Sequence, residues 1–199
     1  MSRFVILSLT LMVFINSSSF PNTVATPPGT YQNHTRYVTT ACNSTTYPMM
    51  CYNSLSSYSA TIKSDPIKLC TTSLNLNVKY AKNSTLVVSN LLQKAKAAKS
   101  HEVSILKDCV DEMKDTIDEL KQAVAEMKYV RGRGKTTEEH LKNVMTWVSS
   151  ALTDEGTCTD GFEEGKVNVE TKKKVKKAVS QLSKTTSNTL ALLTHYLSY

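Results

Sequence analysis

A stripe of apolar residues runs through positions 103–127 and alternates in steps of three and four without a miss. Its members are Val103, Leu106, Val110, Met113, Ile117, Leu120, Val124 and Met127. Steps of three and four keep side chains on one face of an α-helix, so the stripe predicts a long amphipathic helix. Such a stripe is typical of the seam of a helix bundle.

Three further segments carry related patterns. The first starts at Asp65-Pro66 and has apolar residues at Leu74, Val78, Ala81, Val88, Leu92 and Ala95. The second, which Thr136 or Thr137 can cap, has Leu141, Val144, Trp147, Val148 and Leu152. The last has Val175, Val179, Leu182, Thr186, Thr189, Leu193 and Tyr196. A helix break is expected around Gly156, and no segment alternates as a strand would. The chain is therefore predicted to be all-α, an up-and-down four-helix bundle.

The first 64 residues are expected to divide into three parts. Residues 1–25 have the layout of a secretory signal peptide, with an apolar run too short to span a bilayer and cleavage after Ala25. Residues 26–36 lack any period and predict a mobile leader. The domain proper is expected over 37–199, with a disulfide-closed helical hairpin at about 37–64 and the bundle at about 65–199. These features predict a secreted, extracellular protein that neither spans a membrane nor uses one as a partner.

Cysteine and glycosylation patterns agree with export. Five cysteines in an oxidising compartment favour disulfides over a metal site, and they allow fifteen arrangements of two bridges and one free thiol. A local bridge from Cys42 to Cys51 would close the predicted hairpin. Asn33, Asn43 and Asn83 each begin an N-x-S/T triplet, the acceptor for N-linked glycans.

The formal net charge is +7, and positive and negative residues are segregated along the chain. Residues 166–184 are strongly basic, whereas residues 108–120 are acidic. An exported protein meets little nucleic acid, so nucleic acid is not expected as a partner. The lysine run is interpreted as a solvated helix face that could attract acidic cell-wall polymers.

Signals for catalysis are absent from the sequence. The four histidines are far apart, and no nucleophile elbow, P-loop, dinucleotide fingerprint or zinc-protease motif occurs. We therefore expect no enzyme activity, no cofactor and no metal.

Two features remain as candidates for function. Asp111, Asp115 and Asp118 are spaced i, i+4, i+7, which predicts three carboxylates along one helix face, off the apolar stripe. They could form a binding patch for a basic partner. They could also form an ordinary solvated face, in which nearby lysines reduce the repulsion among the three carboxylates. Trp147, the only tryptophan, is expected to fill the core near Cys158.

Four segments in this order resemble the plant invertase and pectin methylesterase inhibitor family. They are "CNSTTYPMMC" (42–51), "LKDCVDEMKDTIDEL" (106–120), "MTWVSSALTDEGTCTDGFEE" (145–164) and "QLSKTTSNTLALL" (181–193). The resemblance covers nearly all of the chain from about Tyr37. It implies a four-helix bundle with an N-terminal hairpin, disulfides Cys42–Cys51 and Cys109–Cys158, and an unpaired Cys70.

The resemblance also implies a function. Members of the family inhibit cell-wall enzymes by binding one to one and covering the substrate cleft. Their enzyme-facing surface in the methylesterase inhibitors matches Asp111, Asp115 and Asp118, together with Thr157 and Asp160. The Pro-Lys-Phe element of invertase inhibitors is replaced here by Gly165-Lys166-Val167, so pectin methylesterase is the favoured target and invertase the alternative.

Two other hypotheses compete with inhibition. An exported helical bundle could carry a hydrophobic ligand in its core, although compact carriers usually contain more cysteines. A detached pro-region that regulates its own enzyme is less favoured, since no catalytic domain follows.

Overall fold

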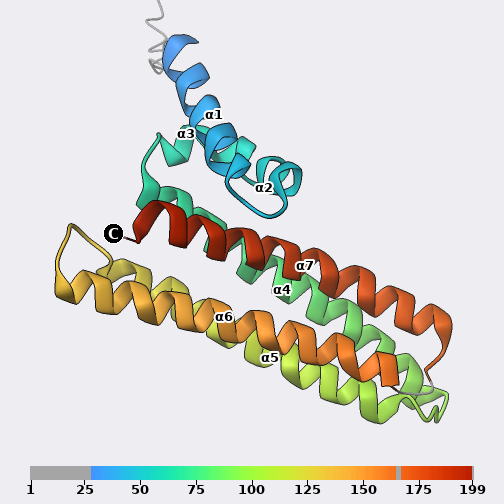
Figure 1. Ribbon diagram of the computed structural model, residues 1–199. Helices are drawn as coiled ribbons and strands as arrows, with labels where there is room; N and C mark the ends of the chain where they lie inside the picture. The colour runs from blue at the N-terminus through green and yellow to red at the C-terminus, as the bar shows by residue number, and fades with distance from the viewer. Residues whose placement is uncertain (1–27, 165–166, 199) are drawn as a thin grey trace, which may run out of the picture.

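The computed structural model describes residues 28–164 and 167–198, and within them it is helical with no strand. Four long helices form the body of the molecule (Figure 1). They are α4 (Pro66–Ala97), α5 (Val103–Glu126), α6 (Lys135–Glu164) and α7 (Val169–Leu197). Three short helices, α1 (Pro28–Asn43), α2 (Pro48–Leu55) and α3 (Ser59–Ile62), form a separate layer beside one end of α4 and α7. The predicted all-α bundle is confirmed.

The four long helices are arranged as a square when the bundle is viewed along its axis. Helix α5 packs against α4 and α6, and α7 packs against α4 and α6, so each helix has two neighbours. The α5–α6 pair therefore forms one side of the bundle and the α4–α7 pair the opposite side (Figure 1).

The apolar stripes meet in the centre of this square. On α5, Leu106, Met113 and Leu120 are fully buried, as the stripe predicts. The core also holds polar side chains between α4 and α7: the Asn77 amide donates to the Thr189 hydroxyl at 2.9 Å, and Ser73 shares a 2.5 Å hydrogen bond with the same hydroxyl. These buried polar groups hydrogen-bond to one another, which offsets the loss of their hydrogen bonds to water.

Local sequence signals explain where most helices begin and end. Asp65 caps α4, since its carboxylate accepts from the amide of Lys68 at 3.0 Å and Pro66 occupies the first turn. Asn168 caps α7 in the same way. A short 3₁₀ turn, Met127–Tyr129, ends α5, and Gly132 and Gly134 adopt positive φ in the turn to α6.

The expected break at Gly156 is wrong, because α6 continues without interruption to Glu164. A glycine in a helix interior costs only about 1 kcal/mol relative to alanine, and the buried side chains of Cys158 and Phe162 beyond it hold that part of the helix on the core. Neither Thr136 nor Thr137 caps α6, because the helix already begins at Lys135. The Thr137 hydroxyl donates instead to the carbonyl of Arg131 in the turn before the helix.

The N-terminal layer starts with a helix. Helix α1 begins at Pro28, inside the stretch 26–36 for which the sequence predicts a mobile leader. The hairpin itself is closed by the Cys42–Cys51 disulfide. It is fastened to the bundle by Asn188 of α7, whose side chain accepts from the Tyr47 amide at 2.8 Å and donates to the Tyr47 carbonyl at 2.9 Å. The predicted signal peptide, residues 1–25, lies outside the described residues.

Candidate functional site

The outer side of the α5–α6 pair carries Asp115, Thr157 and Trp147, three of the residues singled out from the sequence. The two helices are joined by the buried disulfide Cys109–Cys158, with Cα atoms 4.3 Å apart. A hydrogen bond from Ser150 to the carboxylate of Glu119 joins them further along. These two contacts fix the antiparallel register in which side chains of α5 face those of α6.

Several carboxylates lie along this outer side of the α5–α6 pair. Glu112, Asp115 and Glu119 follow one another at steps of three and four on α5 and lie near Asp154 of α6. Burial raises the pKa of the Asp154 carboxyl to about 6, and the negative charges of the nearby Glu119 and Asp115 raise it further. Burial and the charge of Asp154 also raise the pKa of Glu112. We call Glu112, Asp115, Glu119 and Asp154 the acidic row.

The predicted set of Asp111, Asp115 and Asp118 is divided between two rows. Asp111 and Asp118 belong to a neighbouring stripe of alternating charge, in which Asp111 bonds to Lys107 at 3.0 Å and Lys114 at 2.8 Å, and Asp118 bonds to Lys121 at 2.8 Å. The hydrogen bonds from Lys114 and Lys107 lower the pKa of Asp111 to about 2. Within the described residues, Asp115 makes no ion pair, so its charge is the least compensated of the three.

The two candidates on α6 also separate. Thr157 is exposed three residues after Asp154, and its hydroxyl donates to the carbonyl of Thr153. Asp160 instead lines a groove with Lys176 and Lys177 on the α7 side of the helix. Asp115 and Thr157 therefore share the outer α5–α6 side, and Asp160 lies toward α7.

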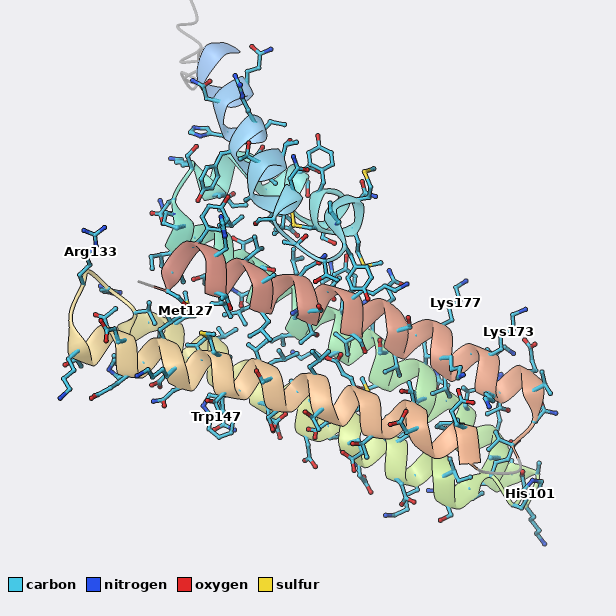
Figure 2. All side chains as sticks on the ribbon, in the orientation of Figure 1. His101, Met127, Arg133, Trp147, Lys173 and Lys177 are labelled. Carbon is cyan, nitrogen blue, oxygen red and sulfur yellow. A yellow bond between two sulfur atoms is a disulfide. The ribbon has the colours of Figure 1, made fainter. Side chains whose placement is uncertain are left out.

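Trp147 is not a core residue, which corrects the sequence prediction. It is half-buried, packs against the core from outside, and projects away from α6 (Figure 2). It lines a groove of about 460 Å³ between α5 and α6 with Glu126, Asn143 and three neighbours. Glu126 accepts there from His140 at 2.7 Å and Asn143 at 2.9 Å. An aromatic side chain thus stands at one end of the face that carries the acidic row.

A family model described as plant invertase/pectin methylesterase inhibitor matches residues 36–192. The chain belongs to this family. It is 92% identical to pectinesterase inhibitor 4 of Arabidopsis thaliana, with all of both chains covered, and 32% identical to pectinesterase inhibitor 11 of the same plant over 92% of this chain and 93% of that one. A crystal structure of a mutant form of a pectin methylesterase inhibitor from Arabidopsis has the same fold, with a TM-score of 0.60 and 17% identity over 80% of this chain and 96% of that chain.

Both disulfides that the resemblance to this family implied are present, and Cys70 is buried without a partner. Of the segment that replaces the Pro-Lys-Phe element of the family's invertase inhibitors, Gly165 and Lys166 lie outside the described residues. Val167 is half-buried and packs against the core.

Other sequence candidates are distributed over the surface of this inhibitor-family fold. Asn33 and Asn43 are exposed on α1, and Asn83 is exposed in the middle of α4. In the part of the chain that the structure describes, no three histidine, cysteine, aspartate or glutamate side chains could hold a metal ion together. No described helix is long and apolar enough to cross a membrane.

Sequence reasoning missed Glu112, Glu119 and Asp154. The signal for the first two was available, because 112, 115 and 119 repeat the spacing of a single helix face. The contribution of Asp154 depends on the register set by the disulfide, which a one-helix pattern does not contain.

Proposed function

We propose that this protein is a secreted inhibitor of pectin methylesterase. The observation that carries the proposal is the 92% identity, over the whole of both chains, to a protein named pectinesterase inhibitor. Relatives of this family bear the same name across a range of identities, which supports the esterase rather than invertase as the partner. We further propose export through the secretory route, with a signal peptide at 1–25.

We infer that inhibition is steric and one to one. The α5–α6 face would lie across the enzyme's pectin-binding cleft, with the carboxylates of the acidic row against basic or polar groups of the enzyme. Asp115 is the strongest candidate, since it is exposed and lacks an intramolecular ion pair in the described chain. Removing one member of a desolvated charged pair typically costs about 2–5 kcal/mol of binding free energy, whereas a rim pair costs little.

Trp147 supports the same face for a separate reason. Tryptophan is enriched at the energetic centres of protein interfaces, because its large ring buries much area with few rotatable bonds. A half-buried tryptophan on the same face as the acidic row would combine an apolar anchor with charges that set specificity. Asp111, Asp118 and Thr157 extend this face, whereas Asp160, which the family resemblance also implies, lies on the α7 side of α6.

The test is release of methanol from methylated pectin by a plant pectin methylesterase, titrated with the oxidised protein. We expect stoichiometric loss of activity with the native chain, and weaker inhibition by Asp115→Ala, Asp118→Lys and Trp147→Ala. Glu139→Gln, which removes an exposed carboxylate near the start of α6, serves as the matched control and should inhibit normally. Unchanged inhibition by all three site variants would remove this face from the mechanism.

Invertase is the second candidate target, favoured only by the family description, which names both enzymes. A parallel assay of sucrose hydrolysis by cell-wall and vacuolar invertases distinguishes them. Loss of invertase activity alone would show that Gly165–Val167 can replace the usual element. Inhibition of neither enzyme, with a fatty acid quenching Trp147 fluorescence, would favour the hydrophobic carrier.

A further inference from the structure

A second surface lies on the opposite side of the bundle from the acidic row. Between α4 and α7 the structure has a groove of about 370 Å³. The residues that line it include Tyr80, Asn83, Lys174, Lys177 and Gln181. The hydroxyl of Ser84 donates to the carbonyl of Ala178 at 3.0 Å, which holds the two helices together beneath it. Among the described residues, two lysines and no carboxylate line this groove, so its lining is positive. Lys177 also borders the adjoining groove that holds Asp160 and Glu163.

The positive charge continues along α7 beyond the groove. Five of the six residues 172–177 are lysine. Lys172 and Lys176 both pair with Glu163, and Lys174 pairs with Glu170 at 3.3 Å. Lys173 and Lys177 are exposed and make no ion pair within the described residues. Both side chains project in the same direction, away from the bundle (Figure 2).

This arrangement is unfavourable for the helix itself. Lysines four residues apart, such as Lys173 and Lys177, repel each other and destabilise a helix. Only part of the repulsion is relieved by Glu163 and Glu170. Proteins keep such locally unfavourable arrangements mainly at functional sites. The uncompensated lysines therefore point to a binding role.

The other groove residues fit a saccharide. The Tyr80 ring offers an apolar surface to the C–H face of a sugar, and the amides of Asn83 and Gln181 can bond to hydroxyl groups. The lysines can bond to a carboxylate as point charges. A chain of uronic acids presents hydroxyls and carboxylates at regular intervals. Its repeated negative charges would match the row of lysines along α7.

We propose that the α4–α7 groove, extended by Lys173, binds the polyuronate that pectin becomes when its methyl esters are removed. The identity of this polymer rests on the proposed function, because hydrolysis of pectin methyl esters leaves carboxylates on the chain. The groove and the acidic row lie on opposite sides of the bundle, so one molecule can hold the polymer and the esterase together.

The test measures binding of the full secreted protein to polygalacturonate in the absence of any enzyme, by titration at several salt concentrations. We expect binding that weakens as salt rises, and at least roughly tenfold weaker binding to highly methyl-esterified pectin of matched length. Lys173→Gln with Lys177→Gln should weaken binding to polygalacturonate roughly tenfold, since two exposed lysine–carboxylate pairs are lost.

The matched control is Lys128→Gln with Lys142→Gln, which removes the same charge from two exposed lysines outside the groove. This control should keep its affinity. Equal losses in both double variants would overturn the proposal, because net charge alone would then explain binding. Gln181→Ala should weaken binding without changing the salt dependence, and unchanged binding would exclude the groove.

Two further outcomes bear on the proposal. A glycan at Asn83 would fill the groove, so peptide mapping that finds this asparagine occupied would overturn it. Binding of a long-chain fatty acid to the groove, with no response to polygalacturonate, would do the same. The Lys173→Gln, Lys177→Gln protein should still inhibit the esterase, and the Asp115→Ala protein should still bind polygalacturonate, so failure of either proposal is recognised independently.

Discussion

The carboxyl group of Glu155 on α6 accepts a hydrogen bond of 2.8 Å from the Thr186 hydroxyl on α7, and neither side chain is exposed to solvent. The second carboxyl oxygen of Glu155 has no hydrogen-bond partner. Burial raises the pKa of this carboxyl to about 7, against the smaller opposing effect of the hydrogen bond from Thr186. The folded protein therefore holds a proton on Glu155 at a pH where the unfolded chain has lost it.

This difference predicts a pH dependence of folding stability. The contribution of Glu155 is fully present below its unfolded pKa of 4.5 and is lost as pH rises through about 7. Between pH 4.5 and 7.5 the native chain should lose about 3 kcal/mol of unfolding free energy relative to Glu155→Gln. Urea titrations of both proteins across this range measure the difference. Parallel stability curves would mean that Glu155 titrates normally in the folded state.

The two disulfides should contribute unequally to stability. The Cys109–Cys158 bridge spans 49 residues and the Cys42–Cys51 bridge spans 9. By chain entropy, removing the longer bridge costs about 4 kcal/mol and removing the shorter about 2.5 kcal/mol. Paired Cys→Ala variants of each bridge, compared by urea unfolding, check this. All four cysteines are buried, so cavity effects largely cancel in the comparison. A larger loss from the hairpin bridge would contradict the prediction.

Thr189→Val should destabilise the fold although the two side chains have nearly the same shape. The substitution removes the acceptor for the buried Asn77 amide and the partner of Ser73. An unsatisfied buried donor costs about 1–3 kcal/mol. Thr194→Val, on the exposed face of the same helix, is the control and should change stability by no more than about 0.5 kcal/mol. Similar midpoints for both variants in thermal unfolding would show that water replaces the lost partner.

Asn188→Ala should loosen the N-terminal layer from the bundle. Its side chain satisfies both the amide and the carbonyl of Tyr47, and alanine leaves both without that partner. We expect the Tyr47 amide to exchange its hydrogen faster, while amides in the core of α5 keep their protection. Asn188→Asp can still accept from the amide but cannot donate to the carbonyl, so an intermediate rate is expected. Unchanged exchange in both variants would show that other contacts hold the layer.

The sequence predicted the bundle well because its helices follow the 3.6-residue period closely. The two predictions that were wrong, a break at Gly156 and a core position for Trp147, rested on the type of residue and not on its position in the period. On α6 the buried positions are 137, 141, 144, 148, 151, 155, 158 and 162, which alternate in steps of four and three. Glu155 occupies the stripe, and Trp147 stands beside it. The period alone predicts that the helix continues past Gly156 and that Trp147 lies at the edge of the buried stripe.

The candidate site was harder to predict than the core. Asp115 fits two spacings, one with Asp111 and Asp118 and one with Glu112 and Glu119, and a single helix pattern does not choose between them. The choice depends on which face of α5 meets α6. That relation is set by tertiary packing and by the Cys109–Cys158 bridge, together with the side chain of Asp154 from another helix.

The acidic row and the lysines of α7 lie on opposite sides of one narrow bundle, so the molecule carries an electric dipole directed across its short dimension. A charged polymer network or a charged enzyme exerts a torque on such a dipole before any contact is made. The protein would therefore arrive at a polyanion with its α4–α7 side leading and its α5–α6 side turned outward. Orientation, as much as affinity, then decides how often an encounter is productive.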